Sequence, residues 1–593
     1  MILAKACPVV SNPRSKDRGY YARVLFFLSD NHIEYHSMGK LFVVLFLLGV
    51  IHGAATYAQF PFNTMDSLDI NNVNARVLVH GDMWWNPATT APTCFFPSGT
   101  KKHINNTSAI WMSGYDSTGL LHIAAQTYRQ RGNDYWPGPL TGDTLSYATA
   151  YAWAKIWKVN LTDIIDFLAQ PSHTTVNTPQ SILTWPGKGN TYAQGNAGAP
   201  LTITDDMAPF IDLNGNGIYE PLLGDYPDIK GNQALWWVFS DNGPVHTETN
   251  GRPLGVEVHA MSYGYSRGTL IDDVVYYDYT IINKSANNYT DFRFSQWDNG
   301  TMGYPSAFSD YIGFDSTWRM GINYNAVNCD GCSNGSPTTL SYGINPPQNA
   351  ITMIVLPGDA GSGYVPAGSF TYFNDDASIV GDPVIDTQYN NYMRSKLRNG
   401  QHFKNDYSGP GSLAVGYGSG PDCNYVFTGD PSDTDQWSQC KNFGTFFGDQ
   451  RFVLSSNSFP LNAGSSAHIL LALIVADSAG GCGFGSYDRI KIVADTAWAV
   501  YHRDETAGVP KISQQQYINI YPNPTHDKLI IECMVSGSIP TIQVFNTLGQ
   551  VMNISISKNG NRYEADLSKL PNGLYDVLYR QDGVEQNSRF VKE

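Results

Sequence analysis

Charged residues are scarce in this sequence: only 15% of the 593 residues are Asp, Glu, Lys or Arg. The net charge is −15 and the pI is about 5.2, which argues against nucleic acid and against an anionic membrane surface as partners. No stretch approaches the length of apolar sequence that crosses a bilayer, apart from a shorter run near the amino terminus. We therefore expect no transmembrane segment in the mature chain.

Signatures of catalysis are missing as well. The sequence holds no Walker A loop, no dinucleotide-binding GxGxxG and no zinc-binding HExxH. Residues 331–335 (Gly-Cys-Ser-Asn-Gly) match GxSxG, but a nucleophile elbow needs a following helix and Ser336-Pro337 follows here. We interpret the match as accidental.

Aromatic and turn-forming residues are abundant, since 13% of the chain is aromatic and 56 residues are glycine. Apolar runs of strand length alternate with turns, for example at residues 73–80, 236–239 and 269–283. The region from Gln59 to about Gln514 can hold two or three domains or one large β architecture. We predict a mainly β fold: a large β-sandwich-type region with few short helices, plus a small C-terminal β-sandwich.

Two hairpins and two helices are predicted within the large region. Residues 108–114 and 120–128 form one hairpin, and residues 452–456 and 468–476 form the last hairpin of the main sandwich. Helical spacing of apolar residues indicates a helix over 487–502 and a shorter one after Thr162. The tryptophan clusters offer a sugar-stacking face, but such side chains more often fill β cores.

The last seventy or so residues form a module of their own, which begins Tyr521-Pro522-Asn523-Pro524. Five short strands are predicted between turn signals, at residues 529–534, 542–545, 551–556, 574–579 and 590–591. Turns are expected at 546–550 and at 570–575, where Gly573 would take a positive φ.

This tail resembles the type A C-terminal sorting domain of the type IX (Por) secretion system. Four motifs carry the resemblance, in this order: Tyr521 to Pro524, Val544-Phe545-Asn546-x-x-Gly549, the run from Asp566 to Gly573-Leu574-Tyr575, and Arg589-Phe590-Val591-Lys592. The resemblance implies binding to the type IX secretion machinery and export across a Gram-negative outer membrane of the Bacteroidetes type. The protein would then be secreted or held at the outer-membrane cell surface. The alternative is an ordinary C-terminal sandwich domain.

A second resemblance covers most of residues 70–500. Residues 132–139 (Gly-Asn-Asp-Tyr-Trp-Pro-Gly-Pro) and Thr184-Trp185-Pro186 are similar to the amino-terminal part of large secreted proteins that carry the same tail and have no assigned activity. This resemblance implies no biochemistry.

An export signal is predicted to begin at Met38, where a short basic start precedes the apolar run 41–51 and a small-residue cleavage site at 56–58. The predicted layout is a start-site artefact (1–37), a signal peptide (38–58), the β-rich secreted region (59–505), a linker (506–516) and the sorting domain (517–593). A division of the secreted region into two subdomains near 240–265 is left open.

The cysteines suit an oxidising compartment. Cys423 and Cys440 are plausible disulfide partners across a loop. Cys329 and Cys332 have CxxC spacing, but a second CxxC and a following helix are missing, which favours a loop disulfide over a metal or redox site.

A calcium loop is the strongest candidate for site chemistry. Asp212, Asn214 and Asn216 place oxygens at positions one, three and five, a glycine stands at six, and the carbonyl of Ile218 stands at seven. This order matches the first half of an EF-hand-like loop, because Ca²⁺ prefers several closely spaced oxygen ligands.

Position twelve of the loop departs from the EF-hand because it is Leu223. A carboxylate ligand would have to come from Glu220, Asp225 or Asp228. We predict a structural Ca²⁺ site, and the alternative is an Asn- and Gly-rich turn whose side chains bond their own backbone.

Two weaker metal hypotheses rest on scattered polar residues. His246-Thr247-Glu248 and Glu257-Val258-His259 would bring four ligands together if they lay on adjacent strands, although polar residues on an exposed hairpin face are the favoured reading. Asp298, Asp310 and Asp315 would support a second cation or else cap loops.

Two functions remain. The first is a non-enzymatic, calcium-stabilised surface protein with a binding, adhesion or structural role and a possible glycan or surface ligand. The second is a secreted hydrolase that acts on glycans or proteins. The missing catalytic signatures favour the first.

Overall fold

The computed structural model describes most of the chain after Pro61, namely residues 62–128, 132–303, 310–332, 338–355, 367–409, 412, 414–433, 435–442, 449–506, 518–533, 540–546, 551–560, 562–581 and 584–593. The chain divides by its contacts into two units, Met1–Pro61 and Phe62–Glu593, and all described residues belong to the second. They form a mainly β fold of antiparallel sheets, so the predicted fold class is confirmed. No helix among them is long and apolar enough to cross a membrane. The predicted signal peptide, the segment before it and residues 507–516 of the linker lie outside the described residues.

The first large sheet has eleven strands, with the order β23-β24-β17-β8-β3-β2-β6-β7 and three further strands paired to this path. Its strands are β1 (Met65–Leu68), β2 (Asn74–Leu78), β3 (Asp82–Met83), β6 (Cys94–Phe95), β7 (His103–Asn105), β8 (Thr107–Tyr115), β9 (Leu121–Ala125), β17 (Tyr289–Asn299), β23 (Ala367–Asn374), β24 (Gln450–Ser456) and β25 (Phe459–Leu461). The predicted hairpin of β8 and β9 is confirmed. Its turn is held by Asp116, whose carboxylate accepts the N–H groups of Thr118 and Leu120.

The second large sheet has nine strands, with the order β10-β14-β15-β16-β26-β22-β19-β18 and β11 paired to β14. Its strands are β10 (Trp136–Pro137), β11 (Trp157–Asn160), β14 (Gln233–Ser240), β15 (Val256–Gly264), β16 (Val274–Asn283), β18 (Asp310–Asp315), β19 (Met320–Asn325), β22 (Gln348–Val355) and β26 (Ser466–Ala476). Three small ribbons complete the large region: β4 (Trp85–Asn86) with β5 (Ala91–Pro92), β12 (Phe210–Ile211) with β13 (Tyr226–Pro227), and β20 (Cys329–Asp330) with β21 (Gly343–Ile344).

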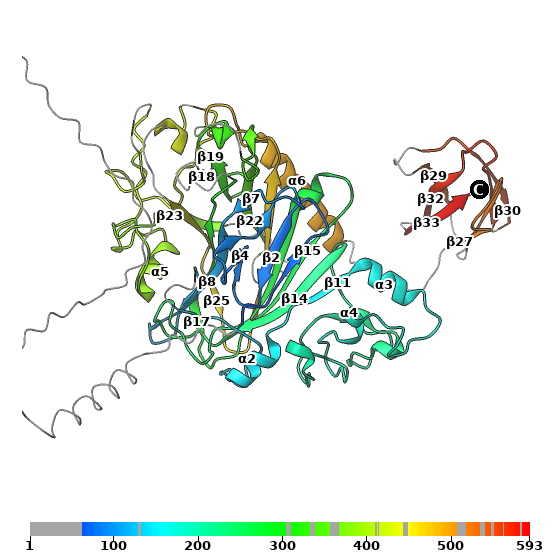
Figure 1. Ribbon diagram of the computed structural model, residues 1–593, viewed down its shortest axis with the longest axis horizontal. Coiled ribbons are helices and arrows are strands. Elements are labelled where there is room, and N and C mark those ends of the chain that lie inside the picture. Colours follow the sequence, from blue (N-terminus) through cyan, green and yellow to red (C-terminus); the bar gives the residue numbers. More distant parts are fainter. Residues whose placement is uncertain are drawn as a thin grey trace, which may run out of the picture. The chain divides into compact units, whose positions relative to one another are not determined.

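The two large sheets pack face to face as a sandwich (Figure 1). The indole N–H of Trp84 donates to the Tyr277 hydroxyl across the interface at 2.7 Å. A Cβ added at Gly321 would come within 3.0 Å of Phe370 and Phe452 on the opposite sheet, so a side chain has no room there. The sequence left open whether the tryptophan clusters fill the core or form a sugar-stacking surface. Tryptophans of these clusters, including Trp84, Trp111 and Trp185, are buried. Each of the two large sheets contains strands that precede residues 240–265 in the sequence and strands that follow them.

The predicted hairpin of residues 452–456 with 468–476 is wrong. β24 pairs with β17 and β23 in the eleven-stranded sheet, whereas β26 lies between β16 and β22 in the nine-stranded sheet. The intervening chain crosses from one sheet to the other, and on the way β25 pairs with β17. Two apolar strands joined by a turn fit either arrangement, so local pattern alone does not decide between them.

Five α-helices are described: α2 (Tyr147–Trp153), α3 (Leu161–Leu168), α4 (Gln180–Leu183), α5 (Asp386–Tyr392) and α6 (Asp488–Thr506). Both predicted helices, α3 and α6, are confirmed. One side of α6, which includes Ile490, Val493 and Ala497, is buried against the outer face of the nine-stranded sheet. The hydroxyl of Tyr276 on β16 donates to the Ala497 carbonyl at 2.7 Å. Because α6 covers this face, β26 is apolar on both sides.

Two disulfides are present among the described cysteines. Cys329 is bonded to Cys332, as predicted. The predicted Cys423–Cys440 pair is wrong, because Cys440 is bonded to Cys482 and Cys423 is a free thiol. Spacing suggested the nearer partner, but Cys482 follows β26 and its N–H donates to the Asn325 carbonyl on β19. The bond thus joins the loop-rich segment before β24 to the end of the nine-stranded sheet.

The C-terminal module is a small sandwich with its own core. Seven strands are described, where five were predicted: β27 (Ile518–Tyr521), β28 (Lys528–Cys533), β29 (Thr541–Asn546), β30 (Ser555–Asn559), β31 (Arg562–Asp566), β32 (Gly573–Gln581) and β33 (Val584–Lys592). They form a four-stranded sheet, β27-β28-β31-β30, and a three-stranded sheet, β29-β32-β33. Buried residues of both sheets, including Ile531, Val544, Ala565, Val577 and Phe590, make the core. The sequence missed β31 because charged residues alternate with its two buried residues, Tyr563 and Ala565.

Candidate functional site

The first motif of the tail is hydrogen-bonded to its last strand. Asn523 accepts the N–H of Val591 on its side-chain oxygen at 2.9 Å, and Thr525 donates its N–H to the Val591 carbonyl at 2.8 Å. Both prolines of the motif, Pro522 and Pro524, follow cis peptide bonds. The Tyr521 to Pro524 motif therefore fixes β33, although the two segments are about seventy residues apart.

The Gly573 to Tyr575 motif has a packing role. The Tyr575 hydroxyl donates to the Pro571 carbonyl at 2.9 Å, and its ring stacks on Phe590 with the centroids 5.6 Å apart. The predicted positive φ at Gly573 is wrong: this residue begins β32 in register with Lys592 and is not among the described glycines with positive φ. Gly549 lies outside the described residues.

The predicted calcium loop lies between β12 and β13. Asp212 accepts the N–H groups of Gly215 and Gly217 at 2.7 Å each, and these bonds lower the pKa of its carboxyl, that from Gly217 most. Both glycines have φ near +75°, a conformation that costs other residues free energy. No α-helix lies directly before β12 or directly after β13, so the loop has no pair of flanking helices, as predicted.

A carboxylate lies beside the two asparagines of the loop. Glu220 accepts the side-chain N–H groups of Asn214 and Asn216 on the same oxygen, at 3.1 and 2.6 Å. Each asparagine also accepts a backbone N–H two residues further on, Asn216 that of Ile218. These are the bonds expected of the self-satisfied turn, and they also gather Asp212, Asn214, Asn216 and Glu220 in one small loop.

Asp225 lies against the loop backbone. Its carboxylate accepts the N–H of Leu213 at 2.9 Å and that of Glu220 at 2.8 Å. Burial of the side chain raises the pKa of Asp225. Leu223, at position twelve, is 64% exposed and contributes no ligand. The donor set suits a hard cation such as Ca²⁺, since it combines carboxylate, amide and main-chain oxygens and contains neither Cys nor His.

The four His and Glu side chains do not form the ligand set that the sequence offered as the weaker hypothesis. The favoured reading, polar residues on an exposed hairpin face, is also wrong for Glu248 and Glu257, which are buried. His246 and Glu248 lie in the loop between β14 and β15 rather than on a strand, and His246 Nδ1 is 3.3 Å from Asp134 Oδ1. Glu257 and His259 do share one face of β15, with Oε1 and Nε2 2.8 Å apart. Among the residues that the structure describes, no group of three or more His, Cys, Asp or Glu is placed to hold a metal ion. A cation at residues 212–225 would therefore also need the amide oxygens of Asn214 and Asn216 and a main-chain carbonyl.

A second histidine–carboxylate pair, which the sequence did not suggest, lies on the same face. His468 Nε2 on β26 is 2.5 Å from Asp278 Oδ1 on β16, and Lys230 contacts the other oxygen of Asp278 at 3.1 Å. Thr280 is the cross-strand neighbour of both His259 and His468. The available signal in the sequence was His468, a polar residue in the otherwise apolar strand β26. Its partner Asp278, however, lies 190 positions away in the chain.

Asp298, Asp310 and Asp315, for which the sequence left a second cation and loop capping open, do not come together. Asp315 accepts the N–H groups of Thr317 and Trp318, as the capping alternative expects. Asp310 and Asp315 stand at opposite ends of β18, roughly 16 Å apart at a rise of about 3.3 Å per residue. Asp315 instead forms an ion pair with Lys491 at 3.2 Å.

Asp298 lies in a buried polar network between the two large sheets. Asn323 donates to Asp298 at 2.7 Å, and also to Asn105 and Asn349 at 3.2 Å each. Burial raises the pKa of Asp298 to about 7, while the hydrogen bonds from Asn323 and Ser108 oppose the shift. This carboxyl is therefore protonated in mildly acidic solution.

The fold and these sites define a mainly β protein built from a large two-sheet sandwich and a small C-terminal sandwich. Residues 519–593 match the family model of the secretion system C-terminal sorting domain, which confirms the resemblance of the tail. The tail directs export by the type IX system to the cell surface or the extracellular space. No curated protein matches the chain.

Two solved structures are distantly similar. A polysaccharide lyase is 7% identical with a TM-score of 0.16, and the match covers 57% of this chain and 34% of that protein. The BSP domain of a biofilm-associated protein is 11% identical with a TM-score of 0.14, covering 90% of this chain and 82% of that one. Likenesses this weak carry no argument about fold or function.

Proposed function

We propose that this exported chain is a calcium-stabilised β-rich surface protein with a binding, adhesion or structural role, and that residues 212–225 hold its Ca²⁺ ion. The observation that carries the proposal is the gathering of Asp212, Asn214, Asn216 and Glu220 in one loop. Asp225 and the main-chain carbonyl of Ile218 would complete the ligands. The ion would offset the charge of these carboxylates and tie the loop between β12 and β13 to the large region.

Calcium is expected to raise the melting temperature of the mature protein by several degrees once its concentration far exceeds the dissociation constant, because only the folded loop binds it. Asp212→Asn should abolish this rise, since it removes a charged ligand. Asp212 accepts the N–H groups of Gly215 and Gly217 on separate oxygens, so the amide oxygen of asparagine keeps one of the two bonds. The measurement is calorimetry on chelator-treated protein, with and without Ca²⁺.

Asp406→Asn is the matched control for that experiment. Asp406 also accepts two glycine N–H groups, from Gly416 and Gly418 at 3.0 Å each. This variant should keep the full calcium response. A wild-type protein that melts at the same temperature with and without Ca²⁺ contradicts the proposed site.

A role in binding rather than turnover is tested on the same mature protein. We expect it to bind a surface or glycan ligand on an array and to release no product from a broad panel of glycan and protein substrates. Turnover that survives repurification would favour the alternative, a secreted hydrolase.

A further inference from the structure

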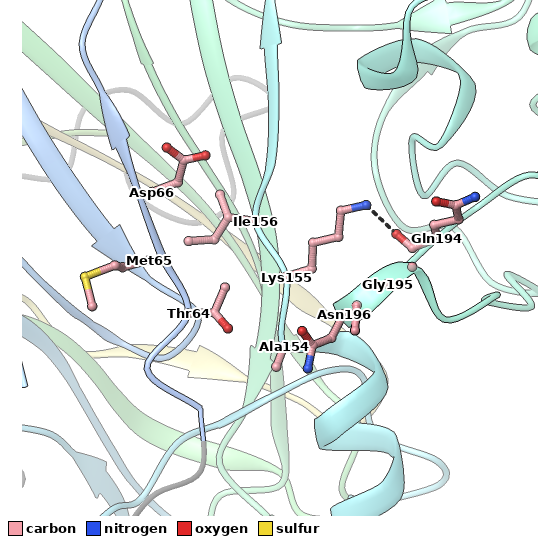
Figure 2. Close-up of a pocket in the computed structure, with 11 residues that line it drawn as sticks. Thr64, Met65, Asp66, Ala154, Lys155, Ile156, Gln194, Gly195 and Asn196 are labelled. Atoms are coloured by element: carbon pink, nitrogen blue, oxygen red, sulfur yellow. Dashed lines mark hydrogen bonds between the residues drawn. The ribbon is translucent and has the colours of Figure 1, made fainter. Parts of the chain in front are cut away.

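A cleft of about 310 Å³ lies beside the C-terminal end of α2. Its walls are the start of β1 (Thr64 to Asp66), the connection from α2 to β11 (Ala154 to Ile156) and the loop 194–198, as Figure 2 shows. Ligand pockets begin at about 300 Å³, so this cleft has room for one small unit of a larger ligand.

The lining of the cleft combines polar and apolar groups. Thr64, Asp66, Gln194 and Asn196 bring hydroxyl, carboxylate and amide groups to it, which together can both donate and accept hydrogen bonds. The side chain of Asp66 is 41% exposed and lies 3.9 Å from the ammonium of Lys158. Planar carboxylates and amides of this kind can hydrogen-bond two neighbouring hydroxyl groups of a ligand.

Lys155 is fixed along the wall of the cleft. Its ammonium donates to the Gln194 carbonyl at 2.7 Å, as Figure 2 shows. The ammonium also lies 5.1 Å from the ring centroid of Trp157. Burial lowers the pKa of Lys155 to about 8. One of its three N–H donors is used by Gln194, so the ammonium keeps donors for a ligand.

An aromatic shelf lies on α2, the helix whose C-terminal cap, Ala154, lines the cleft. Tyr147 and Tyr151 are 52% and 49% exposed, and they lie one turn apart on the same side of α2. Both rings contact the buried ring of Phe62, with centroids 5.5 and 6.1 Å away. Because Phe62 is two residues before Thr64, the base of the shelf continues into the wall of the cleft.

We propose that the cleft and the Tyr147/Tyr151 shelf bind a neutral glycan, with one sugar unit in the cleft and the adjoining units on the tyrosine rings. This inference rests on the proposed binding function and names its ligand class. Tyrosine gives a rigid contact face at a low entropic cost, and the faces of sugar rings are apolar while their edges are polar. A neutral ligand is favoured because Lys155 and Asp66 offset each other and the chain carries a net charge of −15, which repels polyanions.

The test is binding of neutral and acidic oligosaccharides on an array, followed by calorimetry with the neutral oligosaccharide that binds best. Tyr147→Ala combined with Tyr151→Ala should weaken binding of that oligosaccharide by at least about tenfold, and Lys155→Met should weaken it as well. Tyr417→Ala is the control, since that tyrosine is 39% exposed and belongs to another part of the large region. The melting temperatures of all variants should match that of wild type.

Each other outcome overturns the inference. Equal affinity of the double variant and wild type would place the glycan elsewhere, and exclusive binding of acidic oligosaccharides or no binding at all would contradict the ligand class. Equal affinity of the double variant, or exclusive binding of acidic oligosaccharides, leaves the proposed binding role standing, whereas no binding at all contradicts that role as well. The calcium response at residues 212–225 is measured separately from all three results.

Discussion

Replacing Cys440 and Cys482 together with serine is expected to lower the free energy of unfolding by about 4 kcal/mol. The bond closes a loop of 42 residue steps, and removing it gives the unfolded chain back the freedom that this closure takes away. It also frees the segment around Gln439, whose side-chain oxygen accepts the N–H of Ile312 on β18 at 2.9 Å. Denaturant unfolding under non-reducing conditions measures the change.

The Cys329–Cys332 pair is the matched control, because its sequence separation is only 3. On the same chain-entropy argument its double serine variant should lose about 2 kcal/mol. Equal losses from the two variants, or no loss at Cys440 and Cys482, would contradict the pairing.

Asp298→Asn is expected to be more stable than wild type at pH 8, by up to about 4 kcal/mol, and about as stable at pH 4. The folded pKa of Asp298 is raised to about 7 from an ordinary value of 3.8. The folded protein therefore binds a proton that the unfolded chain releases between about pH 4 and pH 7, and the stability from this group is lost as the pH rises through that window. Asparagine resembles the neutral carboxyl and does not titrate.

The measurement is the difference in unfolding free energy between variant and wild type as a function of pH. The contributions of other titrating groups cancel in this difference. Asp206→Asn serves as the control, because its side chain is 91% exposed and its ion pair with Lys188 lies at the surface, where such pairs contribute little to stability. A flat profile for Asp298→Asn would mean that this carboxyl is ionised in the fold.

Local sequence was enough to predict elements whose partners are close in the chain. The β8–β9 hairpin follows from two apolar runs around an Asp–Ser–Thr–Gly turn, and α6 follows from apolar residues at helical spacing. The sorting tail was recognisable because several of its motifs stand in the expected order, and the family model matches residues 519–593. The Asp212 loop is equally local: Asp212 accepts the N–H of Gly215 and Glu220 accepts a side-chain N–H of Asn216. The calcium ion itself stays a prediction.

Long-range pairing could not be predicted in the same way. The sequence of residues 468–476 is compatible both with a hairpin to β24 and with a strand in the other sheet. Its place in the nine-stranded sheet depends on pairing with β16 and on packing against α6. Cys482 and His468 likewise find partners through that sheet rather than through nearby sequence. The His468–Asp278 pair needed the strand order, which no local pattern contains.

The calcium content of the purified mature protein tests the account most directly. After removal of free calcium by buffer exchange, elemental analysis should find one tightly held Ca²⁺ per chain in wild type and none in Asp212→Asn. A wild-type chain without calcium, even after incubation at millimolar Ca²⁺, or an equal content in the variant, would contradict it.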